Sequence, residues 1–411
     1  MLKSLIDAYS ELKNYPVILI LFVLMEFTRA VGFLPFFPGS LVYAVMIVYA
    51  IYNLFHAKQV SVIFLFFLLY LIINILVTAP SPIFQSWGRY ASLVLLFCCI
   101  SPLLMSDTLL SHRRIIFKLT LWLCTLLSVG SFFCFFLGIN FMSTSSVDFS
   151  NTAGIFGGLC NQSMMLGPLA ALSGVFMAYK YFVTSKRMYL FFLLACLGSV
   201  LFSASRSALL SALVGIVAMV FFISENKGMF LKIIVGCTLV AFVTFPLWEG
   251  ATDLVMQKQN ANVESGSTFN SRASKWDNRW EEFESSPLFG VGFAAMDTKY
   301  TDDYQAKTGV LEPGSSWLAV LSMLGLVGFC FVLTFIGKAF VACKVVDRQF
   351  GALCLGLLFL FFIHLIVEGY IFSSGSFLCF LFWIVVGVSY DNLIYAQRVT
   401  ATSSISEMVK N

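Results

Sequence analysis

Charged side chains are scarce in this chain, in which Asp, Glu, Lys and Arg make up 11% of 411 residues. A soluble domain usually carries about 25% charged residues, so this chain cannot present an ordinary water-exposed surface. Hydrophobic residues reach 59% instead, and 45 of them are phenylalanines. These proportions exclude an ordinary soluble domain and indicate a protein that crosses a membrane several times.

Metal-ligand spacing and a cleavable signal peptide are also missing. The 11 cysteines are scattered, mostly within apolar blocks, and are expected to be small buried hydrophobic residues. We therefore predict no metal and no cofactor. The N-terminal residues include acidic ones and no small-residue cleavage site, so the first span is expected to act as the insertion signal. The net charge of +4 follows from basic loops and does not indicate nucleic-acid binding.

Long apolar runs dominate what is present. A membrane-spanning helix needs about 20 mainly apolar residues, and the chain supplies roughly a dozen such blocks. We predict an all-α polytopic membrane protein with about twelve transmembrane helices. The predicted spans are 16–35, 40–55, 60–78, 90–105, 115–139, 162–182, 188–204, 206–223, 229–247, 316–342, 351–372 and 375–394.

The distribution of basic residues predicts the orientation, because cytoplasmic loops keep an excess of Lys and Arg. Alternate short connections hold little beyond Arg89, so both termini are expected in the cytoplasm. Arg89 would then lie on the outer side, where it is a candidate substrate contact. This organisation gives nine spans in 1–247, a long periplasmic loop in 248–315, three spans in 316–394 and a cytoplasmic tail in 395–411. The connections expected on the cytoplasmic side carry the basic residues Lys58, Arg113, Arg114, Lys118, Lys180, Lys186, Arg187, Lys227, Lys232, Lys344 and Arg348.

The long loop contains SKWDNRWEEFESSPLFGVGF, in which Trp276, Trp280 and Phe283 have helical spacing. We predict an amphipathic helix on the membrane surface, followed by a turn at the Pro and Gly residues. Aromatic rings beside charged groups suit sugar binding, so Trp276 and Arg279 are candidate substrate contacts. A packing helix without a substrate role is the alternative.

The stretch SASRSALLSAL places Arg206 in an apolar run, where a charge costs roughly 2.5–3.5 kcal/mol on insertion scales. The predicted orientation puts it at the outer membrane boundary, where Ser203 and Ser205 are candidate helix caps and Arg206 begins a helix. A helix N-terminus is already partly positive, so an arginine there favours a bound anion such as phosphate. An arginine that reaches lipid headgroups is the alternative.

Further polar residues lie at outer boundaries or inside spans. Asn161 follows a Gly-rich stretch and is either a site residue or a helix cap. His364 and Glu368 are four residues apart, so we predict that they share one face of the eleventh span, as a site pair or a structural one. Glu26 and Arg29 are expected to pair structurally in the first span. The tenth span opens with the candidate residues Glu312, Ser315, Ser316 and Trp317.

Three separated stretches together resemble a known superfamily. They are Gly154-x-Phe156 followed by Asn161; Ser205-Arg206-Ser207; and a longer run from Arg272 and Trp276 through Pro287–Gly292 to Trp317-Leu318 and Gly325–Gly328. Their order and placement over about residues 150–330 resemble the bacterial O-antigen ligases and O-antigen or exopolysaccharide polymerases.

The resemblance implies a metal-independent glycosyltransferase of the bacterial inner membrane, with its active site facing the periplasm. Its donor would be a glycan on undecaprenyl pyrophosphate, and its acceptor another glycan or lipid A core. An acceptor hydroxyl would attack the anomeric carbon with inversion, and Arg206 and Arg272, which match the family's two essential arginines, would hold the pyrophosphate. Membrane lipids and a chain-length regulator are the other partners that this reading suggests.

One departure from the family pattern favours a polymerase. Ligases carry a His-Asn pair just before the aromatic-Leu that here is Trp317-Leu318, whereas this chain has Gly314-Ser315. No histidine lies in the long loop, so Glu312 is the nearest candidate base, with His364 and Glu368 as the alternative. A ligase remains the second reading. A transporter or flippase is the rival class, but the two halves show no internal repeat.

Overall fold

The computed structural model describes residues 15–34, 38–142, 156–224, 228, 273–299, 304–305, 310–311, 313–345 and 347–408. These residues are mainly helical, which confirms the all-α class. Two short antiparallel pairs join β1 (Gln59–Val60) to β2 (Leu104–Met105) and β3 (Tyr304–Gln305) to β4 (Val310–Leu311). The helices are α2 (Val17–Thr28), α3 (Gly39–His56), α4 (Val62–Thr78), η1 (Pro82–Phe84), α5 (Ser86–Ile100), α6 (Asp107–Phe136), α7 (Ser163–Thr184), α8 (Arg187–Phe202), α9 (Arg206–Ile223), α12 (Ala273–Ser285), α13 (Ser316–Ala342), α14 (Arg348–Val367) and α15 (Phe377–Met408).

Seven of the described helices are long and apolar enough to cross a membrane. They comprise α3, α5 together with η1, α6, α7, α9, α13 and α14, and the shorter apolar helices are α2, α4, α8 and the first half of α15. Each predicted span overlaps one of these helices except 229–247, which lies outside the described residues. The count of twelve spans therefore stays a prediction.

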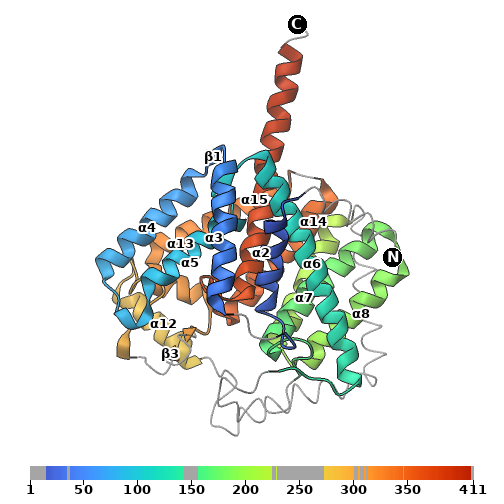
Figure 1. Ribbon diagram of the computed structural model, residues 1–411, viewed down its shortest axis with the longest axis horizontal. Helices are drawn as coiled ribbons and strands as arrows, with labels where there is room; N and C mark the ends of the chain where they lie inside the picture. Colours follow the sequence, from blue (N-terminus) through green and yellow to red (C-terminus); the bar gives the residue numbers. More distant parts are fainter. Residues whose placement is uncertain are drawn as a thin grey trace.

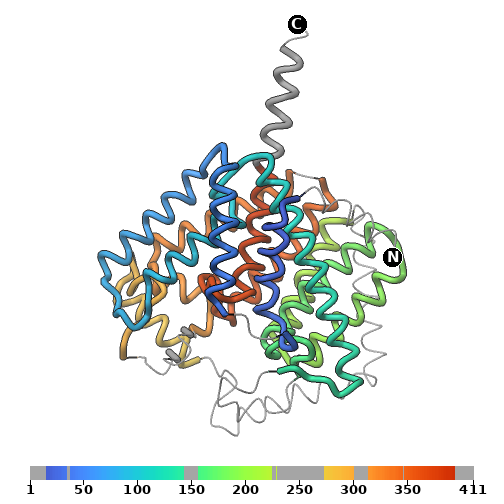
Figure 2. The backbone as a smooth tube through the Cα atoms, viewed as in Figure 1, coloured from blue at the N-terminus to red at the C-terminus, as the bar shows by residue number. Residues whose placement is uncertain are grey.

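The first half of α15 lies at the centre of the bundle, where it packs against α13, α6, α14, α5 and α2 (Figures 1 and 2). Its residues from Phe377 to Tyr390 are almost all buried, as expected of a helix that is hydrophobic on every side. The helix α12 lies at the lower end of Figure 1.

The helix α13 is interrupted at Gly325, which has φ +62° and ψ −167°. The segment Pro287–Gly292 fills this interruption through backbone hydrogen bonds. Val291 and Gly292 donate to the carbonyls of Ser322 and Met323, and Leu326 and Val327 donate to those of Pro287 and Leu288. Because non-helical backbone at membrane depth is tolerated only where protein satisfies it, the inserted segment is what permits the break.

A side chain of α4 holds the inserted segment in place. Asn74 is fully buried, donates through Nδ2 to the Phe289 carbonyl at 2.6 Å, and accepts from the Phe293 N–H at 2.7 Å. The loop that follows α12 is thus fixed to two membrane helices. The amphipathic helix predicted in this loop is confirmed as α12, while its position on a membrane surface stays a prediction.

The placement of Arg113 corrects one sequence prediction. We assigned Arg113 and Arg114 to a connection before a span that begins at 115, but α6 begins at Asp107, with the Ser106 hydroxyl accepting from the Leu109 N–H. Arg113 is buried and makes two hydrogen bonds to Asp391 of α15, at 2.6 and 2.8 Å. This residue therefore joins two helices instead of lying in a loop.

Candidate functional site

A cavity of about 760 Å³ is lined by residues from six separate parts of the chain. Its walls come from the end of α2, from α3, from the start of α5, from the start of α7, from the residues before α13, and from the segment 368–378 between α14 and α15. The polar lining residues among those described are Arg29, Tyr43, Gln85, Arg89, Ser92, Asn161, Gln162, Glu368, Tyr370, Ser373, Ser374 and Ser376.

Arg29 closes the α2 side of the cavity. Its Nη1 lies 3.0 Å from the buried Glu26 carboxylate and donates to the Ser374 carbonyl at 3.1 Å. Its guanidinium lies 5.4 Å from the centre of the Tyr43 ring, within reach of a cation–π contact. The predicted pairing with Glu26 is confirmed. Sequence reasoning missed the position of Arg29 on the cavity, although a charge near the end of a span is itself a site signal.

Asn161 joins the start of α7 to the end of α2. Its Nδ2 donates to the Arg29 carbonyl at 2.9 Å, and its backbone N–H donates to the Ala30 carbonyl. The alternative reading as a helix cap is wrong, because Gln162 precedes α7 and no side chain caps that helix. The Oδ1 atom of Asn161 is buried and has no hydrogen-bond partner among the residues that the structure describes. A ligand N–H or O–H in the cavity could supply one.

Arg89 lies on the α5 side. Its Nε donates to the Phe84 carbonyl at 2.7 Å, which anchors the guanidinium at the start of α5. Arg89 also lines a small neighbouring pocket of about 30 Å³, together with Ala294 and Met323. This second pocket lies where the loop after α12 meets the interrupted helix α13.

The end of α14 corrects a second prediction. The helix stops at Val367, and Glu368 has an extended backbone with φ −132° and ψ 137°, so His364 and Glu368 do not share a helix face. Glu368 lines the cavity. The ring of His364 is buried, and its Nδ1 lies 2.9 Å from the Tyr370 hydroxyl. The two residues are separated because Ser316 binds the chain at Glu368 and prevents the helix from continuing.

The residues at the start of α13 support the cavity walls. The Ser315 hydroxyl caps α13 by accepting from the Leu318 N–H, and the Ser316 hydroxyl donates to the Glu368 carbonyl at 2.6 Å. The Trp317 indole donates to the Phe362 carbonyl on α14, whereas that of Trp276 on α12 donates at 3.1 Å to Gly314, a lining residue. None of the four predicted contacts Trp276, Ser315, Ser316 and Trp317 is among the lining residues itself.

Arg206 begins α9, and the Ser205 hydroxyl accepts from the Ala208 N–H, so the predicted cap is confirmed. Ser203 differs from the prediction, since its hydroxyl donates to the Val200 carbonyl at the end of α8. Arg206 is exposed and lines a second, mainly apolar pocket of about 210 Å³ between α8 and α9. The structure therefore does not bring Arg206 into the main cavity. The other two catalytic candidates, Arg272 and Glu312, lie outside the described residues.

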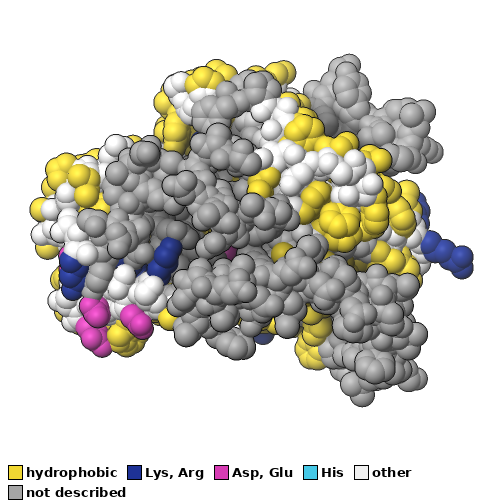
Figure 3. Space-filling view, turned by 90° about the horizontal axis from the view of Figure 1, so that it is seen from below, with side chains coloured by type: hydrophobic (Ala, Val, Ile, Leu, Met, Phe, Trp, Pro, Cys, Tyr) yellow, Lys and Arg dark blue, Asp and Glu magenta, His cyan; other side chains and the backbone are white. Residues whose placement is uncertain are grey.

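At the lower end of the molecule, Figure 3 shows acidic and basic side chains gathered toward the side that α12 occupies in Figure 1. Arg279 of α12 does not belong to this exposed group. It is fully buried, and its Nη1 lies 2.9 Å from the equally buried carboxylate of Glu282. Arg279 is also not among the lining residues of the cavity, so its predicted contact with substrate stays a prediction.

The pKa of Glu282 is raised above 4.5 because burial disfavours its charge, although Arg279 and a hydrogen bond from the Asp297 N–H oppose the shift. Between pH 4.5 and the raised pKa, the folded protein therefore binds a proton that the unfolded chain lacks, and stability rises as the pH falls. We expect the melting temperature of the wild type, relative to Glu282→Gln, to increase from neutral pH toward pH 4.5. Glu281→Gln, at a 59% exposed position on the same helix, is the control, and a constant difference between wild type and Glu282→Gln would contradict the expectation.

Comparison with known families gives one match. Residues 190–333 match the model of a family described as O-antigen ligase, which confirms the resemblance to the ligase and polymerase superfamily. The match runs from α8 to α13 and includes the positions of Arg206, Arg272 and Glu312, but not those of Arg29, Arg89 and Glu368. No curated protein matches the chain.

Proposed function

We propose that this protein is a polysaccharide polymerase, because residues 190–333 match the model of the O-antigen ligase family, whose members are glycosyltransferase-like enzymes that act on lipid-linked glycans. It transfers a glycan from undecaprenyl pyrophosphate onto a second lipid-linked repeat unit, on the periplasmic side of the inner membrane. The observation that carries the proposal is the family match, together with a cavity that combines two arginines, a carboxylate, amides and hydroxyls. At about 760 Å³, this cavity lies within the usual range of roughly 300–1,000 Å³ for ligand sites.

The proposed chemistry makes modest demands on the protein. Pyrophosphate is a good leaving group, so the main need is positive charge near the oxygen on which negative charge grows. We assign that task to Arg206 and Arg272, and the binding of sugar to the cavity that Arg89, Asn161 and Glu368 line. The acceptor hydroxyl must lose its proton to a base, and the two candidate bases are the carboxylates of Glu312 and Glu368.

A ligase that transfers the glycan to lipid A core is the second candidate, since it would use the same donor and the same chemistry. The residues Gly314 and Ser315, at the places of the ligase His-Asn pair, favour the polymerase. The family match does not favour a flippase. A chain-length regulator would be a partner of the polymerase rather than of the ligase.

Arg206→Ala tests the proposal in a deletion strain that carries the variant gene. We expect long-chain glycan to fall by about 10²–10³-fold while the amount of membrane-inserted protein is unchanged, because loss of one charge-stabilising donor typically costs this much. Arg187→Ala is the matched control, since Arg187 is likewise an exposed arginine at the first position of a helix. Normal chain length in Arg206→Ala would contradict the proposed site.

The deletion strain itself separates the two candidate functions. Lipid A core that carries a single repeat unit indicates a lost polymerase, whereas long polymer retained on the lipid carrier indicates a lost ligase. If the protein does not act on lipid-linked glycans, neither product would accumulate and the glycan pattern of the deletion strain would equal that of the wild type.

A further inference from the structure

Glu368 stands out among the residues around the main cavity. Of the described residues that line the cavity, it is the one with a carboxylate. It lies where α14 ends and the chain becomes extended, so Glu368 belongs to the extended segment that lines the cavity and not to the helix.

The position of Glu368 is fixed by a side chain 52 residues away in the sequence. Ser316 donates to the Glu368 carbonyl twice, through its backbone N–H at 3.0 Å and its hydroxyl at 2.6 Å. The same hydroxyl accepts from the N–H groups of Tyr370 at 3.0 Å and Ile371 at 3.3 Å. One serine therefore satisfies the carbonyl of Glu368 and two N–H groups of the chain that follows it.

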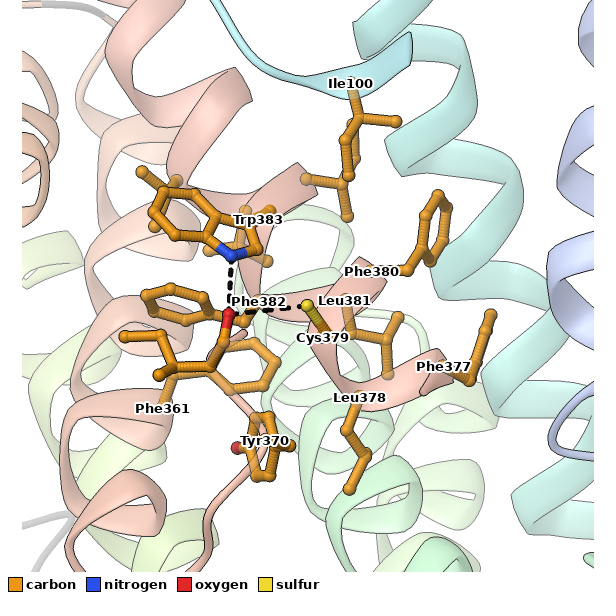
Figure 4. Packing of buried hydrophobic residues seen from close by; sticks show 14 of the residues in the cluster. Ile100, Phe361, Tyr370, Phe377, Leu378, Cys379, Phe380, Leu381, Phe382 and Trp383 are labelled. Atoms are coloured by element: carbon orange, nitrogen blue, oxygen red, sulfur yellow. Dashed lines mark hydrogen bonds between the residues drawn. The ribbon is translucent and has the colours of Figure 1, made fainter. Parts of the chain in front are cut away.

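A second anchor holds the same segment from the side of α15. Figure 4 shows the indole nitrogen of Trp383 and the sulfur of Cys379 directed to one carbonyl oxygen, that of Ile371, at 2.8 and 3.4 Å. Both side chains are fully buried. A group that takes part in chemistry must be held close to its productive geometry by packed neighbours, and this segment meets that condition.

Basic groups line the same cavity as Glu368. They are Arg29 from α2 and Arg89 from α5, and Tyr43 and Tyr370 are the other titratable groups in the described lining. His364 is not a lining residue, because its ring is buried against the Tyr370 hydroxyl. The cavity therefore offers guanidinium groups to an anionic part of a ligand and one carboxylate to a hydroxyl that must lose a proton.

We propose that Glu368 is the general base of the transfer reaction and that Ser316 is its positioning residue. This inference rests on the proposed function. The Glu368 carboxylate takes the proton from the acceptor hydroxyl as the acceptor oxygen bonds to the anomeric carbon. The bond from that carbon to the phosphate oxygen breaks, and the lipid pyrophosphate leaves with the electron pair. Glu368 then returns the proton to water.

The experiment uses the full-length protein in liposomes, supplied with undecaprenyl-pyrophosphate-linked glycan extracted from the deletion strain. We expect Glu368→Gln to lower the rate by about 10²–10⁴-fold, the usual contribution of a general base. The fall in rate of the wild type at acidic pH should vanish in the residual activity of Glu368→Gln. Glu281→Gln, an exposed carboxylate on α12, is the matched control and should keep the full rate and the acidic fall.

Variants of Ser316 test its positioning role separately from the role of Glu368. Ser316→Ala should lower the rate about tenfold and keep the acidic fall, because the base is present but less well held, whereas Ser316→Thr should restore most of the rate through its hydroxyl. A purely structural serine would lower the yield of folded protein without this rescue, and that result would overturn the positioning role.

Failure of the inference differs from failure of the proposed function. If the wild type extends glycan, Arg206→Ala does not, and Glu368→Gln keeps at least a third of the wild-type rate with an unchanged pH profile, Glu368 is not the base and the proposed function stands. If the wild type transfers no glycan from the extracted donor and the deletion strain makes normal glycan, the proposed function fails first.

Discussion

Gly325→Ala is expected to remove most of the correctly folded protein, although it adds a single methyl group. Gly325 occupies a backbone conformation that is nearly restricted to glycine, and any other residue there costs about 1–3 kcal/mol. The added Cβ would also overlap the Leu288 carbonyl and lie 2.6 Å from the Phe289 nitrogen. The inserted segment would therefore have to leave the interruption of α13.

Expulsion of that segment explains the size of the expected effect. Four backbone hydrogen bonds join Pro287–Gly292 to α13, and each contributes about 0.5–1.5 kcal/mol net. The sum with the backbone strain approaches the 5–15 kcal/mol that typically separates folded from unfolded protein. Gly290 faces the same constraint, since its φ is +72° and a Cβ would overlap the backbone of Met323.

The measurement is the yield and melting temperature of the detergent-solubilised monodisperse protein. Gly337→Ala is the matched control, because it lies in the same helix and its Cβ would meet nothing within 4 Å. Alanine is the better helix former by roughly 1 kcal/mol, so this control should be unchanged or slightly more stable. A Gly325→Ala protein with wild-type yield and melting temperature would show that the inserted segment is not needed to hold α13.

Patterns within one segment predicted the fold well where the cause of the structure is local. Apolar run length placed α13 at 316–342, where the structure has it, and the serine before Arg206 correctly marked the start of α9. The interruption at Gly325 could not be read from the same run, because the sequence on either side remains apolar. What breaks this helix is a segment 33 or more residues earlier in the chain.

The candidate site was predicted in part for the same reason. Arg89, Asn161 and Glu368 were singled out because polar groups at the ends of spans are unusual, and the structure places all three on one cavity. The end of α14 was predicted five residues too late, since the bond from Ser316 that ends it joins distant parts of the sequence. Arg29 was assigned to Glu26 alone, because its contact with Ser374 spans 345 residues.

Arg113→Ala is expected to destabilise the protein by about 3–5 kcal/mol, the cost of leaving one partner of a buried ion pair uncompensated. Arg113 and Asp391 are both almost completely buried, and the guanidinium also donates to the carbonyls of Ser101 and Leu104. One side chain thus joins α6, α15 and the turn before α6. Asp391→Ala should cost a similar amount, because it leaves a buried guanidinium without its carboxylate.

Thermal unfolding of the two single variants and of Arg113→Met/Asp391→Leu measures this effect. The double variant should recover part of the loss, since a well-packed apolar pair can replace a buried ion pair whereas a single buried charge cannot be tolerated. Arg114→Ala is the control: its neighbouring guanidinium is partly exposed and bonds to Asn392 at 3.3 Å, so we expect a change below about 1 kcal/mol. If Arg113→Ala were as mild as Arg114→Ala, Arg113 would act as an ordinary basic residue at a helix end.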